Sequence, residues 1–356
     1  MPYPRAISAA MTHDTPQPAA GRRVLVTGSA GFIGYHLSKL LLDEGFRVHG
    51  LDGMTDYYDV ALKRRRHAML LQTEGFTATE GLLEAPGVVA EATRAFAPDI
   101  VVHLAAQAGV RYSIENPRAY VDSNVVGTFE VMEAAREAGV DHLLMASTSS
   151  VYGANEDMPY AETDKADTQL TIYAATKKAT EALSHSWAHI HGLPTTCFRF
   201  FTVYGEWGRP DMAYFKFASA IREGRPIDVY NHGDMWRDFT YVGDLVRAIR
   251  LLIDVPPVRP KSAEEIEERD SLSPVAPWRV VNIGNSDKVR LTDFIDALEA
   301  ALGQKAVRNY MEMQQGDVPA TWADATLLRR LTGYAPRTDV GDGLARFAAW
   351  WRDWQG

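Results

Sequence analysis

One glycine-rich stretch near the start of the chain limits the possible folds most. Residues 24–34 read VLVTGSAGFIG, with three apolar residues before a turn that contains Gly28, Gly31 and Gly34. An apolar-periodic run follows and ends at Gly45. This is the pattern of a buried parallel strand, a tight turn and a helix.

Each glycine has a distinct use if that turn binds a dinucleotide. Gly28 allows the tight turn, Gly31 lets the backbone approach a pyrophosphate at the helix N-terminus, and Gly34 lets helix and strand pack closely. A second strand, residues 47–51, ends at Asp52, which can bind both adenosine ribose hydroxyls and repel a 2′-phosphate. The stretch therefore predicts an NAD site. The G-x-x-G-x-x-G spacing departs from the commonest fingerprint, and a purely structural glycine turn is the alternative.

Strands and helices continue to alternate along the first two thirds of the chain. Further strands are predicted at 76–82, 99–106, 142–148 and 195–201, with helices at 88–96, 119–138 and 172–192. This order predicts an α/β fold with a right-handed, doubly wound parallel Rossmann sheet and a smaller C-terminal α/β substrate lobe. We expect a disordered tail at 1–20 and an NAD-binding Rossmann domain at 21–200, with a return segment at about 238–285. Residues 201–237 and 286–356 then form the substrate lobe.

The composition fits a globular protein and argues against some classes of partner. Hydrophobic residues make up 46% of the 356 positions and charged residues 23%. The net charge of −9 argues against binding to bulk nucleic acid or to an anionic membrane. No apolar run approaches the ~18 residues of a membrane span. The single cysteine, Cys197, lies in an apolar run, so we expect a buried thiol and a cytoplasmic protein without disulfides.

Two residues on a predicted helix carry the chemistry. Tyr173 and Lys177 are four positions apart, so they share one helix face. A free tyrosine titrates near ~10, and a lysine ammonium together with a nicotinamide cation would lower that pKa. The phenolate could then accept a hydroxyl proton while the carbon loses hydride, with Thr148 hydrogen-bonded to the reacting oxygen. The alternative is a packed core tyrosine and a surface lysine.

Two other polar features receive a structural interpretation. Four basic residues stand in a row at 63–66. They could bind phosphate, but on a helix they point to different sides, so a solvated face is favoured. His103 lies on a predicted strand, where a hydrogen-bonded core histidine is favoured over a functional one.

Taken together, these motifs resemble the extended short-chain dehydrogenase/reductases of the nucleotide-sugar epimerase group, and within it the bacterial and plant UDP-glucuronate 4-epimerases. The stretches that carry the resemblance are 27–34, 56–59, 103–113, 173–178, 200–212 and 237–242. The most specific are QAGVRYS at 107–113 and GRPDM at 208–212. The sequence departs from the family at three positions, where Gly53, Gly81 and Gly243 replace the usual Asn, Asp and Asp. None of the three belongs to the catalytic group, so we expect the departures to affect ligand affinity more than activity.

The resemblance implies tightly held NAD, no metal, a UDP-sugar substrate and a homodimer formed as a four-helix bundle by the Tyr–Lys helix and its predecessor. It makes Tyr173 the base, assisted by Lys177 and Thr148. The implied cofactor positions are Gly28, Gly31, Phe32, Ile33, Gly34, Asp52, Gly81, Leu82, Leu104, Ala105, Ala106, Gln107, Asn124, Ser147, Tyr173, Lys177 and Phe200. The implied substrate positions are Arg111, Ser149, Ser150, Thr202, Arg209, Ala213, Lys216, Val229, Tyr230, Arg237 and Asp317.

The implied activity is an NAD-dependent interconversion of UDP-glucuronate and UDP-galacturonate through a 4-keto intermediate. A 4,6-dehydratase would need a pair of carboxylates after Thr148, and a glucuronate decarboxylase would be expected to carry Glu at Ser150. The chain has Ser149 and Ser150 there, which supports neither. The alternatives are a UDP-glucose/galactose-type 4-epimerase, a UDP-glucuronate decarboxylase and, outside enzymes, an NAD-binding regulatory protein.

Overall fold

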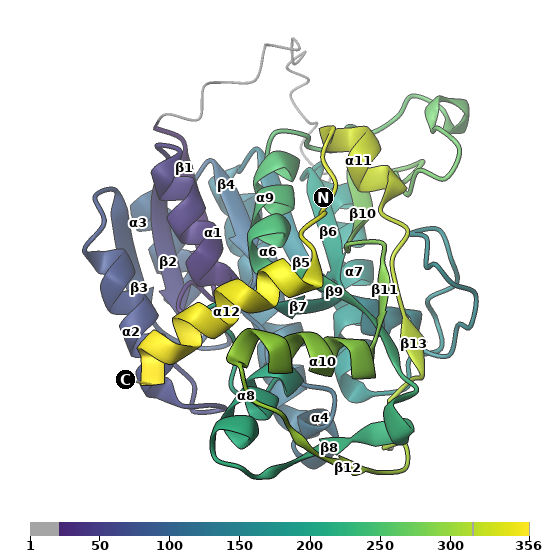
Figure 1. Ribbon diagram of the computed structural model, residues 1–356. Helices are drawn as coiled ribbons and strands as arrows, with labels where there is room; N and C mark the ends of the chain where they lie inside the picture. Colours follow the sequence, from purple (N-terminus) through teal and green to yellow (C-terminus); the bar gives the residue numbers. More distant parts are fainter. Residues whose placement is uncertain (1–20, 315–316, 356) are drawn as a thin grey trace, which may run out of the picture.

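A seven-stranded parallel sheet forms the centre of the molecule (Figure 1). In this computed structural model, which describes residues 21–314 and 317–355, the strand order is β10-β6-β5-β4-β1-β2-β3. The strands are β1 Arg23–Thr27, β2 Arg47–Asp52, β3 Phe76–Glu80, β4 Ile100–His103, β5 His142–Thr148, β6 Thr195–Phe200 and β10 Trp278–Ile283. The predicted doubly wound sheet is confirmed, and its order reverses between β1 and β4, where such sheets bind ligands.

Helices cover both faces of this sheet because its strands are apolar on both sides. Val24 and Val26 of β1 lie in one hydrophobic cluster with α1, and Leu25 between them lies in a second cluster with α6. The helices around the sheet are α1 Phe32–Asp43, α2 Val60–Leu71, α3 Val88–Phe96, α6 Gly127–Ala138, α7 Ile172–His191 and α9 Val242–Leu252. Helix α9 packs against α1, so the chain returns to the face of the sheet that α1 covers.

The segment predicted as a helix at 119–138 is helical throughout, but it is not a single α-helix. The segment consists of α5 Pro117–Tyr120, the π-helix η1 Val121–Val126 and then α6, preceded by the short α4 Tyr112–Glu115. The wider π turn brings Asn124 to the buried side, where its side chain bonds the backbone of Gln107. Two predicted strands also end early, at Glu80 and His103, because the residues that follow turn away from the sheet.

The smaller lobe is built from short strands and four helices. It contains β7 Thr202–Tyr204, α8 Ala213–Arg222, β8 Pro226–Val229, β9 Trp236–Tyr241, β11 Lys288–Arg290, α10 Leu291–Leu302, β12 Val307–Tyr310, β13 Ala320–Thr321, α11 Thr326–Thr332 and α12 Val340–Gln355. Helix α12, yellow in Figure 1, runs back across the molecule from this lobe and ends near α2. The guanidinium of Arg65 on α2 stands 5.0 Å from the ring of Trp354.

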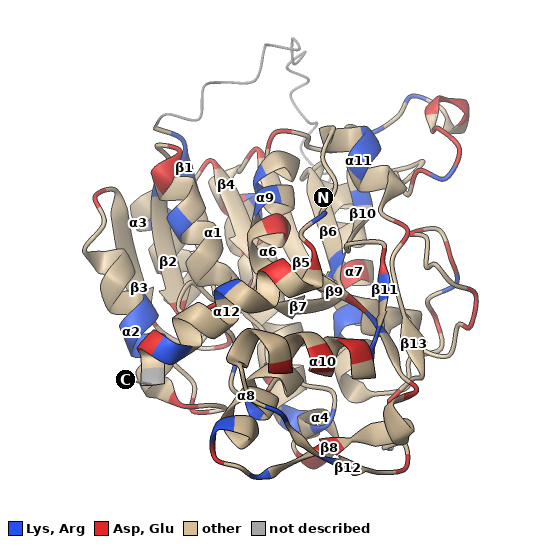
Figure 2. Ribbon diagram, in the orientation of Figure 1, with Lys and Arg blue, Asp and Glu red and all other residues tan. Residues whose placement is uncertain are grey.

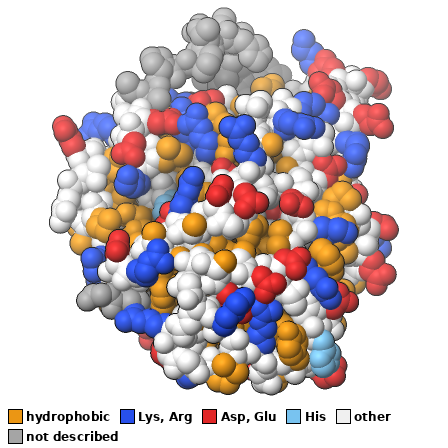
Figure 3. Space-filling model, viewed as in Figure 1, with side chains coloured by type: hydrophobic (Ala, Val, Ile, Leu, Met, Phe, Trp, Pro, Cys, Tyr) orange, Lys and Arg blue, Asp and Glu red, His pale blue; other side chains and the backbone are white. Residues whose placement is uncertain are grey.

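The surface carries charges of both signs. Figure 2 shows Lys and Arg interspersed with Asp and Glu over most elements, and Figure 3 shows small hydrophobic areas between them on the same face. Within residues 21–314 and 317–355, none of the helices combines the length and apolar character needed to cross a membrane. The tail predicted at 1–20 lies outside the described residues, and so do residues 315, 316 and 356 of the predicted substrate lobe.

Candidate active site

A cavity of about 640 Å³ opens beyond the carboxyl ends of β1, β2, β4 and β5. It is lined by most of the predicted cofactor residues: Gly28, Gly31, Phe32, Ile33, Gly34, Asp52, Leu82, Leu104, Ala105, Ala106, Gln107, Ser147, Tyr173, Lys177 and Phe200. Two predicted cofactor residues stand behind this lining. Gly81 donates its N–H to the carbonyl of Asp52 at 3.0 Å, and Asn124 Oδ1 accepts from Gln107 N at 2.7 Å.

The glycine turn leaves no room for side chains, which fits a dinucleotide. A Cβ at Gly28 would lie 2.8 Å from Ala105 N, and one at Gly34 would lie 2.0 Å from Gly28 O. Asp52 is fixed at the end of β2, since its carboxylate accepts from Ala30 N and Met54 N, each at 2.9 Å. A backbone cradle at the N-terminus of α1, with a carboxylate at the neighbouring strand end, is the donor set that NAD needs.

At the other end of the cavity lie Thr148, Tyr173 and Lys177. Thr148 is the last residue of β5, and the other two begin α7. Burial raises the pKa of Tyr173, while a hydrogen bond with Thr148 and the charge of Arg209 act to lower it. Burial lowers the pKa of Lys177 to about 8. The net direction of the Tyr173 pKa is thus upward, and the predicted lowering would need the nicotinamide cation beside the phenol.

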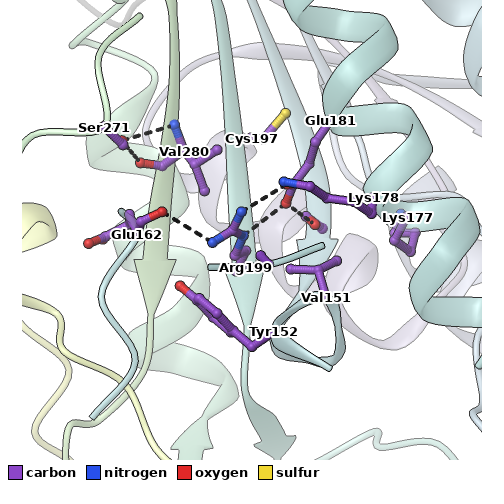
Figure 4. Close-up of polar contacts among 12 residues, drawn as sticks. Val151, Tyr152, Glu162, Lys177, Lys178, Glu181, Cys197, Arg199, Ser271 and Val280 are labelled. Carbon is purple, nitrogen blue, oxygen red and sulfur yellow. Dashed lines mark hydrogen bonds and ion pairs between the residues drawn. The ribbon is translucent and has the colours of Figure 1, made fainter. Parts of the chain in front are cut away.

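Behind Lys177 lies a buried ion pair that sequence reasoning missed (Figure 4). Arg199 on β6 donates through Nε and Nη2 to the carboxylate of Glu181, each at 2.9 Å, and both side chains are almost fully buried. Ser147 Oγ donates to the same carboxylate at 2.6 Å. Burial acts to raise the pKa of Glu181, but Arg199 and its other partners hold it at about 2. The missed signal is the spacing, since Glu181 continues the four-residue repeat of Tyr173 and Lys177 along α7.

Three of the predicted substrate residues meet although they come from distant stretches. Arg111 Nη2 lies 3.2 Å from Asp317 Oδ2, and the Arg111 guanidinium stands 5.2 Å from the ring of Tyr230. Arg209 lines the main cavity and is held by Asp211, with Nε 3.0 Å from Oδ1.

The remaining predicted substrate residues stand outside the lining of that cavity. Ser150 N donates to Thr148 Oγ1 at 3.2 Å, and Ser149 lies between these two residues. Arg237 donates to the carbonyls of Val318 and Pro319 at 2.8 and 3.2 Å. Besides Arg111, Tyr230 and Asp317, the predicted substrate residues that the described cavity does not include are Ser149, Ser150, Thr202, Ala213, Lys216, Val229 and Arg237.

The interpretation of residues 63–66 as a solvated face is wrong for two of the four. Arg64 and Arg65 are exposed, but Lys63 is 6% exposed and Arg66 is fully buried. Lys63 lines the cavity and donates to the carbonyl and hydroxyl of Thr55 at 2.6 and 3.0 Å. Lys63 and Arg66 are three positions apart, so they lie on the same face of the helix, and this spacing could have indicated that both are buried.

His103 is a core histidine, as predicted. Its ring nitrogens lie 2.7 Å from Thr27 Oγ1 and 2.9 Å from Thr128 Oγ1. Thr27 Oγ1 already accepts from Leu104 N and Ala105 N, so its O–H donates to Nδ1 and the proton of His103 stays on Nε2. Burial lowers the pKa of His103 to about 3, which keeps the ring neutral. The predicted burial of the Cys197 thiol is confirmed. Over the described ranges, no three His, Cys, Asp or Glu side chains gather as a metal site.

Comparison with known proteins gives consistent matches. The model of the NAD dependent epimerase/dehydratase family matches residues 24–263. A probable UDP-glucuronate 4-epimerase of Rhizobium meliloti (strain 1021) is 53% identical over 329 residues, covering 92% of this chain and 96% of that protein. UDP-glucuronate 4-epimerase 1 of Arabidopsis thaliana is 43% identical over 343 residues, covering 95% and 78%. The crystal structure of UDP-glucuronic acid 4-epimerase from Bacillus cereus, in complex with UDP-glucuronic acid and NAD, superposes with a TM-score of 0.82 at 29% identity, covering 93% and 99%.

Proposed function

The chain belongs to the NAD dependent epimerase/dehydratase family, and on that basis we propose that it is an NAD-dependent 4-epimerase that interconverts UDP-glucuronate and UDP-galacturonate. One observation carries the proposal: Thr148, Tyr173 and Lys177 line the same cavity as the glycine cradle and Asp52. The names of the relatives from Rhizobium meliloti and Arabidopsis thaliana support the same substrate.

In this reaction the chain supplies a proton acceptor and anchors. Tyr173 takes the proton of the sugar C4 hydroxyl, Thr148 hydrogen-bonds the reacting oxygen, and the Lys177 ammonium stabilises the phenolate. When bound at the cradle, NAD would accept the C4 hydride and its reduced form would later return it. The 4-keto sugar turns about its diphosphate, and Tyr173 returns the proton. C4 is then inverted with no net redox change.

The residues after Thr148 favour an epimerase over a 4,6-dehydratase or a glucuronate decarboxylase. Ser149 and Ser150 begin the short 3-10 helix η2 Ser149–Tyr152, so hydroxyls stand where a dehydratase needs carboxylates. Asp211 occupies the fork of Arg209. A C6 carboxylate would then be held by the hydroxyl of Thr148, which lines the cavity, and by those of Ser149 and Thr202, whose neighbours in sequence line it. Without a bidentate arginine to pin one orientation, the ring keeps the freedom to turn.

The test is to incubate purified protein with UDP-glucuronate without added cofactor and to resolve the products. We expect UDP-galacturonate to form and UDP-glucose to be a poor substrate. Thr202→Val should raise KM for UDP-glucuronate and let some UDP-pentose appear, because a β-keto acid loses CO₂ when its carboxylate turns out of the carbonyl plane. A parent protein that prefers UDP-glucose is a neutral-hexose epimerase, and one that makes mainly UDP-pentose is a decarboxylase.

We also propose a cytoplasmic homodimer that forms through η1, α6 and α7. Val126, Phe129 and Ile190 on these helices are 41%, 40% and 66% exposed. Phe129 packs edge-to-face on Trp187, with ring centroids 5.6 Å apart, so an aromatic pair joins α6 and α7 beside these exposed side chains. A self-complementary surface of this kind suits a twofold interface.

A further inference from the structure

Arg66 on α2 is fully buried, which is unusual for an arginine. Its Nη1 donates to Ala30 O and to Tyr58 Oη, each at 3.0 Å. Its Nη2 donates to Gly208 O at 3.1 Å and to Trp207 O. All four acceptors are neutral oxygens, so this buried cation depends on several well-placed hydrogen bonds.

These acceptors come from three segments that surround the cavity. Ala30 lies inside the glycine cradle between Gly28 and Gly31, and its own N–H bonds Asp52. Tyr58 lines the cavity after β2. Trp207 and Gly208 belong to the smaller lobe and lead directly into Arg209. A single guanidinium thus joins the cofactor loop of one lobe to the substrate loop of the other.

The planar shape of the guanidinium makes this connection rigid. Its N–H groups have fixed directions, so carbonyls that bind opposite ends cannot shift independently. The ring of Trp207 is also packed by Trp350 and Trp354 of α12, with centroids 5.3 and 5.5 Å away, so the far side of the loop is supported as well. A ligand that orders the segment of Ala30 therefore also orders the segment of Trp207 and Gly208.

We infer that Arg66 is a positioning residue that couples the two ligand loops, so that a bound UDP-sugar slows the release of NAD and bound NAD strengthens the binding of the UDP-sugar. The coupling is reciprocal because each ligand removes part of the cost of ordering a shared unit. The identity of the two ligands rests on the proposed function.

The experiment follows the release of bound NAD from the purified holoenzyme, with and without saturating UDP. In the parent protein UDP should slow the release by about 5-fold or more, within the usual range of coupling between sites. In Arg66→Met this factor should fall to about one. The control is Arg64→Gln, which changes an exposed arginine of the same helix and should keep the parent factor.

A second variant keeps the test informative if Arg66→Met does not fold. Arg66→Lys retains the charge but cannot reach both pairs of acceptors, so the UDP effect on NAD release should again disappear. Its KM for UDP-glucuronate should rise while kcat changes little, since Tyr173 and Lys177 lie on α7. If either variant keeps the parent factor, or if UDP does not slow NAD release in the parent, the coupling role is rejected. A parent that shows the coupling but does not epimerise UDP-glucuronate would refute the proposed activity alone.

Discussion

Several polar side chains in and beside the cavity are held by protein partners. Asp52 accepts two backbone N–H groups, and Arg209 is bound to Asp211. The hydroxyl of Thr27 accepts two N–H groups at the end of β4 and donates to His103. Side chains that are already held by hydrogen bonds pre-organise a site, because a ligand does not have to order them when it binds.

Replacing Tyr173 with Phe removes the proton acceptor while keeping the ring. Positioned acid–base groups contribute ~10²–10⁴-fold in rate, so we expect epimerisation to fall at least that much. NAD should still co-purify in the parent ratio, measured after release by denaturation. Activity within a few-fold of the parent would show that another residue is the base.

Glu162 offers a test of pH-dependent stability. Burial raises its pKa from 4.5 to about 7, and its Oε1 accepts from Asn282 N at 2.8 Å. Between these two values the folded state binds more protons than the unfolded state. The stabilising contribution of this carboxyl is therefore complete below pH 4.5 and is lost as the pH rises through 7.

Glu162→Gln keeps the oxygen acceptor and removes the titration. Relative to the variant, the parent should lose on the order of 2–3 kcal/mol of unfolding free energy between acidic and mildly alkaline pH. Urea unfolding of both proteins at pH values on either side of this window measures the difference. If the unfolding free energies of parent and variant change with pH by the same amount, Glu162 does not titrate in this range.

At the scale of elements, α7 is attached to the sheet by the face that carries Tyr173 and Lys177. Tyr173, Lys177 and Glu181 repeat every four positions, and Glu181 is bonded to Arg199 of β6. Arg199→Met leaves the buried carboxylate without this partner, which typically costs about 3–5 kcal/mol. The double variant Glu181→Gln with Arg199→Met removes the charge and should be more stable than Arg199→Met alone in denaturant titrations. If the double variant is less stable than Arg199→Met alone, the unpaired charge of Glu181 is not the cause of the destabilisation.

Elements and residues with local signals could be predicted from the sequence. The glycine turn of Gly28 to Gly34 and the pair of Tyr173 and Lys177 depend on spacings of a few residues, so they were recognised. Arg66 was misjudged because its partners Trp207 and Gly208 lie 141 and 142 positions away, beyond any local period. The π turn at 121–126 escaped because it spans six residues, which is too short a stretch for the hydrophobic period to be read.

At the scale of the whole molecule, the proposed dimer can be tested on its apolar surface. Phe129→Glu places a charge in the surface formed by η1, α6 and α7, and burying an unpaired charge there opposes association. We expect the variant to sediment as a monomer where the parent sediments as a dimer. Leu71→Glu on α2, which is 53% exposed in the parent, is the control and should leave the assembly unchanged. A dimeric Phe129→Glu protein would place the interface elsewhere.

Strand β10 has a consequence for how such proteins can be recombined. It closes the sheet beside β6, with Trp278 opposite Thr195, although the chain has crossed into the smaller lobe and back between them. A fragment that stopped at residue 200 would leave the edge of β6 open to strands of other molecules. A chimera that exchanges the substrate lobe with that of another protein therefore needs separate junctions on both sides of β10, and crossover at one point would break the sheet. Because β10 belongs to the sheet, a single crossover cannot transfer the smaller lobe alone.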